Sequence, residues 1–424
     1  MKFTKTVLNN GLRIITVPMT DNPSVTILVM VEAGSKYETK KQNGISHFLE
    51  HMVFKGTPRR PKASDISREL DSLGAHYNAF TTQEFTGYYA KAASRSLDSL
   101  IDIVSDMYMN PLFDEAEITK EKGVIIEEVR MYNDLPQRRV HEILGELMFG
   151  DQPAGWSVLG SEENIRAFSR EDFTKYRKDN YVSSATTVLV AGSFDEGETI
   201  SKIEKAFSSV VADPKKAKLA VTEEQQLPAI KTFFKETDQT HLVIAARTFS
   251  ITDPRIPTMA VLTTILGGGM SSRLFSKMRD ELGICYYIRA SHDASTDHGE
   301  ISISAGVDNV RVEEAVREIL KQCVNLKNDL VSPAELKKVK DYISGTTLLE
   351  LETSESRAEY CGVQEILKKR IDTPEEFMSK VSAVTADDIQ KLARQIFVDK
   401  GLNMAIIGKF QSGDGFESYF KFDL

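Results

Sequence analysis

The sequence predicts an α+β fold of two homologous α+β domains, each a mixed, mostly antiparallel sheet covered by helices. The first observation is size and composition: 424 residues with 41% apolar and 27% charged residues suit a globular protein of two or three domains. The second is that period-two and helical patterns alternate along the chain. The third is that the order of these patterns in the first half returns in the second, which indicates an internal duplication.

The first half begins with strand patterns near 5–17 and 24–32. The turn Asn9-Asn10-Gly11 divides the first of these into a strand pair. We expect helices at 44–54 and 64–73, strands within 76–92, further helices to about residue 178, a strand at 186–194 and a helix at 197–208. These elements predict a first domain over residues 1–210.

The second half follows a polar stretch with a proline near each end, which predicts a linker over 211–230. We expect a strand at 240–247, a helix near 254–265 and strands near 285–291 and 299–306, within a second domain over 231–424. The segment Ala116-Glu117-Ile118 aligns with Ala334-Glu335-Leu336, at a shift of 218 residues, close to half the chain. This offset supports the duplication.

Charge and cysteine content exclude several classes of protein. Lys and Arg number 53 against 62 Asp and Glu, a net charge of −9, which argues against a general binder of nucleic-acid phosphates. The three cysteines lie far apart without a CxxC pair, which favours a reducing compartment. Export or import signals and apolar runs of about 18 residues are not visible. We therefore expect a cytoplasmic protein without a membrane or nucleic-acid partner.

The predicted helix at 44–54 carries an HxxEH motif. Its apolar residues form one stripe, whereas His47, Glu50 and His51 gather on the opposite face. Two histidines at i and i+4 lie one turn apart and can share a Zn²⁺ ion through ring nitrogens. Glu50 is placed to act as a general base on a water at the metal rather than as a ligand. The alternative is a surface helix whose His and Glu side chains are merely solvated.

A two-histidine site of this type needs a third ligand, usually a carboxylate. On the helix that starts near Asp114, Glu117, Glu121 and Glu128 fall on one stripe because their spacings are close to whole turns. We expect Glu128 to be the ligand, Glu121 to be a carboxylate that orients a ligand, and Glu117 to be solvated. Glu127 points away, but it would take the place of Glu128 if the helix were rotated by one residue.

The segment HFLEHMVFKGT, followed by Glu128, resembles the active-site signature of the inverzincin metallopeptidases of the pitrilysin family (M16). The similarity is greatest to the mitochondrial processing peptidase beta subunit and to bacterial processing-peptidase-like zinc proteases. It covers nearly the whole chain, since VEAGSKYE, LGAHYNAFTTQEFTGYYAK, LGSEENI and GGGMSSRLFSKMRDELGICY follow in family order. The resemblance implies one zinc per chain on His47, His51 and Glu128, with Glu50 as general base and Glu121 as accessory carboxylate.

The resemblance also implies how a substrate is held. Arg279 and Tyr286 match a family pair, seven residues apart, that would hold the substrate carbonyl and stabilise the oxyanion. Without the resemblance, they would be a surface charge on a helix and a core aromatic residue. The strand with Asn78 and Ala79 matches the segment along which family members bind a peptide as an added strand.

Family members of this length pair two chains around a chamber, so that Arg279 and Tyr286 would serve the zinc of the partner. We therefore expect a zinc-dependent endopeptidase that cleaves unfolded peptides inside a dimeric chamber, as a homodimer or as a heterodimer with a paralogue. The alternative is a catalytically silent peptide-binding or assembly subunit. The complete set of His47, Glu50, His51 and Glu128 argues against that alternative, since silent members generally lose part of it.

Overall fold

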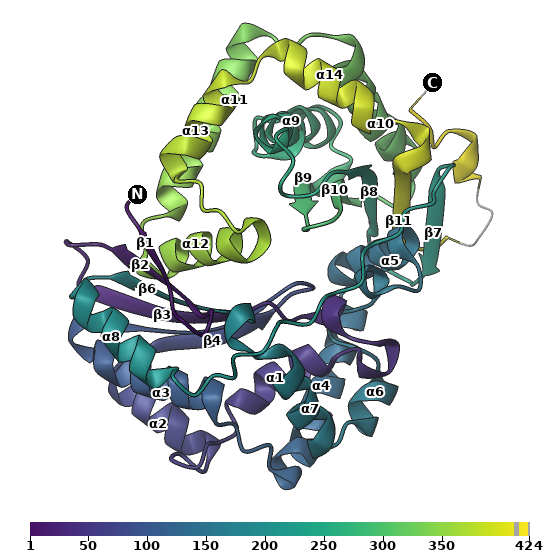
Figure 1. The fold of residues 1–424 in the computed structure, drawn as a ribbon. Coiled ribbons are helices and arrows are strands. Elements are labelled where there is room, and N and C mark those ends of the chain that lie inside the picture. The colour runs from purple at the N-terminus through teal and green to yellow at the C-terminus, as the bar shows by residue number, and fades with distance from the viewer. Residues whose placement is uncertain (411–414, 423–424) are drawn as a thin grey trace. The chain divides into compact units, whose positions relative to one another are not determined.

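The computed structural model describes residues 1–410 and 415–422 and divides into two compact units (Figure 1). The first unit contains Met1–Arg130, Trp156–Leu219 and Leu348–Thr373, and the second contains Met131–Gly155, Ala220–Thr347 and Pro374–Leu424. Each unit is one sheet with helices against it. The predicted α+β fold with two sheet domains is therefore confirmed.

The sheet of the first unit has the strand order β1-β2-β6-β3-β5-β4, and β4 lies at one edge. The strands are β1 (Thr4–Val7), β2 (Arg13–Pro18), β3 (Ser24–Val31), β4 (His76–Thr81), β5 (Thr86–Ala93) and β6 (Thr186–Gly192). Only β2 and β6 are parallel to each other. The central strands β3 and β6 read as nearly continuous apolar runs because both of their faces are covered.

The sheet of the second unit has the order β7-β11-β8-β10-β9. Its strands are β7 (Ala229–Phe234), β8 (Thr240–Thr248), β9 (Cys285–Ala294), β10 (Gly299–Val307) and β11 (Leu402–Gly408). Only β7 and β11 are parallel, and the order repeats that of β2, β6, β3, β5 and β4 in the first sheet. This shared topology supports the duplication. The sequence analysis assigned no strand to β7, whose partly exposed side chains lack a period-two pattern.

Helices account for most of the remaining chain. The helices of the first half include α1 (Ile45–Val53), α2 (Ala63–Ser72), α3 (Leu97–Met109), α4 (Glu115–Asp134), α6 (Glu162–Ala167), α7 (Arg170–Asn180) and α8 (Glu196–Ala206). The second half contains α9 (Ile256–Gly267), α10 (Val312–Asn328), α11 (Pro333–Glu350), α13 (Pro374–Ala383) and α14 (Ala386–Ile396). No helix in the described part of the chain is long and apolar enough to cross a membrane.

One helix from each half of the sequence belongs to the unit formed mainly by the other half. Helix α5 (Pro136–Phe149) packs on β8 and β11 of the second unit, and α12 (Ser354–Lys368) packs on β3 and β6 of the first. The two units therefore differ from the predicted domains 1–210 and 231–424, because residues 131–155 belong to the second unit and residues 348–373 to the first. The physical reason is apolar burial: Ala358, Cys361 and Ile366 of α12 cover the sheet face that presents Leu28 and Leu189.

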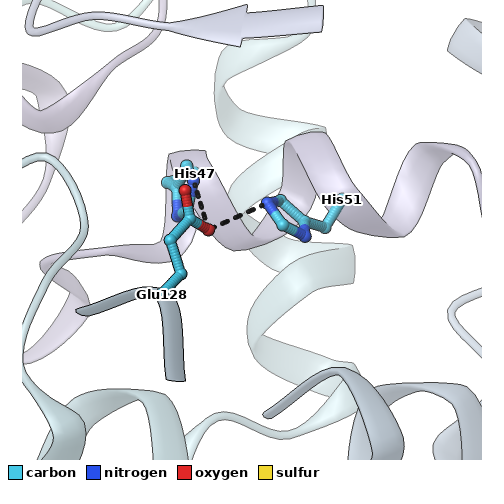
Figure 2. Close-up of side chains that lie close together, drawn as sticks. All are labelled: His47, His51 and Glu128. Atoms are coloured by element: carbon cyan, nitrogen blue, oxygen red, sulfur yellow. Dashed lines mark ion pairs between the residues drawn. The ribbon is translucent and has the colours of Figure 1, made fainter. Parts of the chain in front are cut away.

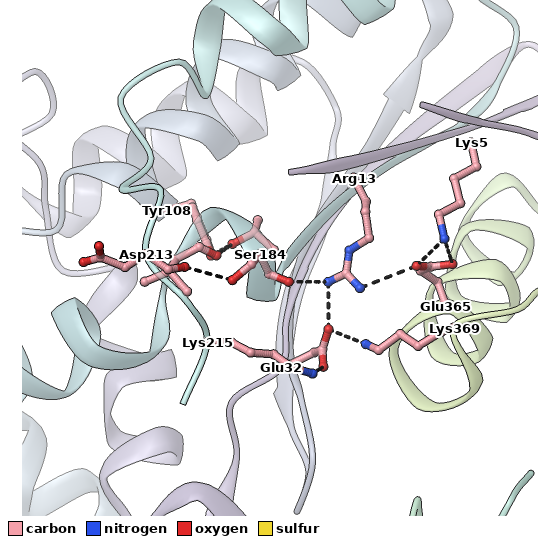
Figure 3. Close-up of polar contacts among 11 residues, drawn as sticks. Lys5, Arg13, Glu32, Tyr108, Ser184, Asp213, Lys215, Glu365 and Lys369 are labelled. Atoms are coloured by element: carbon pink, nitrogen blue, oxygen red, sulfur yellow. Dashed lines mark hydrogen bonds and ion pairs between the residues drawn. The ribbon is translucent and has the colours of Figure 1, made fainter. Parts of the chain in front are cut away.

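Buried ion pairs also join helix α12 to strands β1 and β2 of the same unit (Figure 3). The Glu365 carboxylate lies 2.7 Å from Lys5 Nζ and 3.5 Å from an Arg13 guanidinium nitrogen. Glu32, which is 4% exposed, binds Arg13 at 2.8 Å and also Lys215 and Lys369. Burial, only partly offset by Glu32, lowers the pKa of Lys369 to about 8. The network joins β2, the predicted linker and the end of α12.

Candidate metal centre

Helix α1 begins at a position that the surrounding backbone fixes. Gly44 has φ of +99°, and a Cβ atom there would lie 2.8 Å from the Cα of Gly160, so only glycine fits without strain. The buried Glu38 carboxylate accepts the backbone N–H groups of Gly44 at 2.9 Å and Ser46 at 2.8 Å. These contacts satisfy donors that the first turn of a helix leaves unpaired, and they hold α1 in place.

The two faces predicted for α1 are present. The apolar face is at most 1% exposed and consists of Ile45, Phe48, Leu49, Met52 and Val53. The Phe48 ring meets the Phe173 ring of α7 edge to face, with their centroids 4.8 Å apart. This packing leaves the other face of α1, with His47, Glu50 and His51, to form the candidate site.

His47 and His51 of α1 meet Glu128 of α4 (Figure 2). Oε2 of Glu128 lies 3.6 Å from Nε2 of His47 and 3.6 Å from Nε2 of His51. Ligands about 2.0–2.1 Å from a zinc ion at tetrahedral angles are roughly 3.3–3.4 Å apart. The spacing of the three residues therefore fits a zinc ion. Within residues 1–410 and 415–422 they form the one group of three or more His, Cys, Asp or Glu residues spaced for a metal.

The protonation of these histidines suits a metal ligand, which must be a neutral imidazole. Burial, with a smaller effect from the nearby His51, lowers the pKa of His47 to about 3, so its ring is neutral at pH 7. Nδ1 of His51 lies 2.8 Å from Oε1 of Glu121. This contact occupies one ring nitrogen and turns the other, Nε2, toward Glu128.

Glu121 supports the cluster without belonging to it. Its second carboxylate oxygen, Oε2, lies 2.5 Å from Lys55 Nζ. Burial favours the neutral acid, but the hydrogen bonds and charges of His51 and Lys55 prevail, and the pKa of Glu121 falls below its usual value. An ionised Glu121 can accept the Nδ1 proton of His51, and its role in orienting a metal ligand stays a prediction.

Glu50 lies beside the cluster and is held by a residue of the edge strand. The Thr81 hydroxyl donates a hydrogen bond of 2.5 Å to Oε2 of Glu50. Burial raises the pKa of Glu50, against the lowering effects of Thr81 and His51, and the negative charge of Glu128 raises it further. Glu50 is thus near both His51 and Glu128. The sequence analysis did not identify Thr81 as a partner of Glu50. The one signal in the sequence that could have indicated it is the position of Thr81 at the end of the strand that carries Asn78 and Ala79.

The structure separates the glutamates of α4. Glu128 faces the histidines, whereas the Glu127 side chain is 73% exposed and pairs with Arg130 at 2.8 Å. The rotated alternative, with Glu127 as ligand, therefore does not match the structure. Glu117 pairs with the neighbouring Lys120 on the surface of the helix, as expected for a solvated residue.

Asn78 and Ala79 lie on β4, the edge strand of the first sheet. Among the described residues, β4 pairs with β5 on one side only. The strand contacts α1, and its last residue, Thr81, is the hydrogen-bond partner of Glu50. The Asn78 side chain accepts the backbone N–H of Ala79 at 2.9 Å. The edge thus runs next to the candidate metal centre.

Arg279 and Tyr286 lie together in the second unit. Arg279 belongs to a π-helical segment, Phe275–Glu281, and Tyr286 lies at the start of the edge strand β9. The guanidinium carbon of Arg279 is 5.7 Å from the centroid of the Tyr286 ring. Tyr286 is 70% exposed, so the interpretation as a core aromatic residue is wrong. Cys285 beside it is buried, which raises its pKa to about 11 and suits a packing residue.

Two histidines one turn apart on a helix, completed by a glutamate from a second helix, are the ligands of the two-histidine, one-carboxylate class of zinc sites. Residues 13–162 match the family model "Insulinase (Peptidase family M16)", and residues 167–343 match "Peptidase M16 inactive domain". The chain belongs to peptidase family M16.

Related sequences extend over nearly the whole chain. The uncharacterized zinc protease YmxG of Bacillus subtilis is 35% identical over 394 residues, which cover 92% of this chain and 94% of YmxG. An uncharacterized zinc protease of Rickettsia felis is 32% identical, over 93% of this chain and 95% of its own.

Solved structures show the same fold. A protease from Helicobacter pylori has a TM-score of 0.90 at 22% identity, with 96% of this chain and 99% of that chain covered. A chain of Complex III2 from Candida albicans has a TM-score of 0.86 at 17% identity, with 99% of both chains covered. At these identities the similarity concerns the fold alone.

Proposed function

We propose that the protein is a zinc-dependent endopeptidase that hydrolyses peptide bonds of unfolded peptides. The observation that carries this proposal is the cluster of His47, His51 and Glu128 with Glu50 held beside it. The names of related proteins, which are called zinc proteases, agree with it. An assembly subunit without activity would have no need of a complete ligand set and a neighbouring base.

His47, His51 and Glu128 would hold one Zn²⁺ ion per chain, which supplies a Lewis acid and lowers the pKa of water. The protein's own groups then move the protons. Glu50 accepts a proton from the attacking water and later donates one to the leaving amine. Glu121, fixed by Lys55, keeps the His51 ring in the orientation that ligation requires.

The edge of β4 that has no partner strand in the described part of the chain suits an extended peptide. A peptide that adds to this edge as a further strand is held through its main chain, so binding depends little on its sequence but requires that it be unfolded. Asn78 and Ala79 would lie against such a peptide. The contact between β4 and α1 would bring its carbonyl groups near Glu50.

We further propose that two chains enclose the substrate, either two copies of this protein or this chain and a paralogue. Arg279 and Tyr286 would donate hydrogen bonds to the oxyanion that develops on the scissile carbonyl of a peptide bound in the partner chain. The exposure of Tyr286 supports a role at a surface that another molecule covers.

The first test compares wild type with Glu50→Gln on a mixture of unfolded peptides about 10 to 30 residues long, with the zinc content of both proteins determined. The expected result is equal zinc and cleavage by wild type alone, because the variant loses the base and keeps the ligands. Cleavage by the variant would contradict the role of Glu50. One zinc per chain without cleavage by wild type would favour the silent peptide-binding subunit.

A second test addresses the dimer by mixing two inactive variants, Glu50→Gln and Tyr286→Phe. If Tyr286 acts on the partner's zinc, the mixed dimer contains one complete site, and activity returns on mixing. If Tyr286 acts within its own chain, both sites of the mixed dimer stay defective. Each variant alone serves as the control, with chain exchange followed by native mass spectrometry.

A further inference from the structure

Thr81 connects two functional parts of the first unit. It is the last residue of β4, the edge strand that bears Asn78 and Ala79, and it reaches α1 through its hydroxyl. Among the described residues, this 2.5 Å hydrogen bond to Oε2 is the one hydrogen bond or ion pair that the Glu50 carboxylate makes. The carboxylate therefore has one fixed oxygen and one that remains for the site.

The Thr81 hydroxyl is itself supported from behind. Thr86 is paired with Thr81 in the β4–β5 register, and its hydroxyl lies 3.5 Å from Oγ1 of Thr81. Thr86 is completely buried, and its hydroxyl donates its one proton to the carbonyl oxygen of Ala33 at 2.9 Å, so its 3.5 Å approach to Thr81 is a packing contact. Since both threonines belong to a paired hairpin, the hydroxyl that meets Glu50 is held by the sheet rather than by a mobile loop.

A proton acceptor must be placed to within a fraction of an ångström, and a displacement of 1 Å can reduce a rate about a hundredfold. Glutamate has three rotatable side-chain bonds, so a free carboxylate would occupy several positions. We propose that Thr81 is a positioning residue, which fixes the Glu50 carboxylate by its hydroxyl hydrogen bond and so couples the peptide-binding edge strand to the general base. This inference rests on the proposed peptidase function.

The test uses two substitutions in the full chain. Thr81→Val removes the hydroxyl but keeps the volume and the branched shape that favour a strand, whereas Thr81→Ser keeps the hydroxyl. The control is Thr187→Val on β6, because the buried hydroxyl of Thr187 has no hydrogen-bond partner in the described structure. For each protein, kcat and KM on one cleaved peptide, zinc per chain and the unfolding midpoint are measured.

We expect Thr81→Val to lower kcat about tenfold or more, with KM within about twofold of wild type, one zinc per chain and an unchanged unfolding midpoint. Thr81→Ser should recover most of kcat, and Thr187→Val should behave as wild type. A Thr81→Val protein with wild-type kcat would overturn the inference. Equal losses in the Val and Ser variants, or a change in KM alone, would also overturn it, because they indicate packing or substrate binding.

A second readout does not depend on activity. Crystal structures of the metal-free wild type, Thr81→Val and Thr81→Ser would show the Glu50 side chain directly. We expect one conformation in wild type and Thr81→Ser, and a displaced or multiple conformation in Thr81→Val. An unchanged Glu50 in Thr81→Val would overturn the inference even if wild type cleaves peptides. If wild type cleaved no peptide, the proposed function would fail, and these structures would still decide whether Thr81 holds Glu50.

Discussion

His51 and Glu121 are joined by a 2.8 Å contact between Nδ1 of the histidine and Oε1 of the glutamate. The two residues lie on different helices, α1 and α4, and the contact fixes which ring nitrogen of His51 faces Glu128. Because α4 also supplies Glu128, one helix both completes the candidate metal cluster and contacts one of its histidines from behind. Glu121 is only 5% exposed, which protects this contact from competing water.

Glu121→Gln should therefore weaken zinc binding without abolishing it. The amide cannot accept the His51 proton as strongly as a carboxylate, and loss of such an orienting partner typically reduces metal affinity about 10–100-fold. Competition with a chelator of known affinity measures the effect. Glu117→Gln, one turn earlier on α4 at a residue that pairs with the surface residue Lys120, is the control and should keep wild-type affinity. Equal affinities in both variants would contradict the role of Glu121.

Glu128→Gln and Glu127→Gln form a second matched pair. Glu128 lies 3.6 Å from each histidine, whereas Glu127 points to solvent and pairs with Arg130. We expect Glu128→Gln to lose zinc on dialysis and Glu127→Gln to keep one equivalent, as measured by elemental analysis. Zinc loss from the Glu127 variant alone would show that Glu127, and not Glu128, is the metal ligand.

Glu300 should make the second unit less stable at neutral than at acidic pH. It lies on β10, opposite Asp293 of β9 and Arg247 of β8. Burial and the charge of Asp293, only partly offset by Arg247, raise the pKa of Glu300 to about 7 from an ordinary 4.5. Between these values the folded protein holds a proton that the unfolded chain has lost. The stability due to this proton is full below pH 4.5 and is lost as pH rises through 7.

This difference in pKa lowers the free energy of unfolding by about 3 kcal/mol between acidic pH, below 4.5, and alkaline pH, above 7. Glu300→Gln removes the titration, so the variant should gain stability over wild type at pH 8 and show little difference at pH 4.5. Unfolding midpoints of both proteins at several pH values give the comparison. Parallel pH profiles for the two proteins would show that Glu300 titrates normally.

Glu365→Gln should weaken the packing of α12 on the first unit and lower the stability of the protein. The carboxylate is 1% exposed and binds both Lys5 and Arg13, so its loss leaves a nearly buried guanidinium without one of its charge partners. Removal of one member of such a buried pair destabilises a protein by about 3 kcal/mol. Chemical unfolding monitors the loss, and protease cleavage near residues 348–373 should become faster. Glu352→Gln, at an exposed position just before α12, is the control and should have neither effect.

Local patterns were sufficient for the parts of the site that lie on single helices. The apolar stripe of α1 is buried as predicted, and the stripe of α4 separates Glu121 and Glu128 from the exposed Glu127. Helical periodicity decides which residues share a face, and it can be read without knowing what the helix packs against. The same reasoning missed β7, whose side chains carry no periodic pattern because they are only partly buried.

The sequence by itself determined the two-sheet α+β class, the HxxEH helix and the face of α4 that meets it. These depend on the spacing of apolar and polar residues within single helices and strands, which can be read locally. Only the tertiary structure decided that α5 and α12 cover the sheet of the other half, that Lys55 holds Glu121, and that Thr81 holds Glu50. Thr81 and Glu50 are 31 residues apart, and α12 and β3 more than 300. Such contacts arise from the packing of whole elements, which no local spacing encodes.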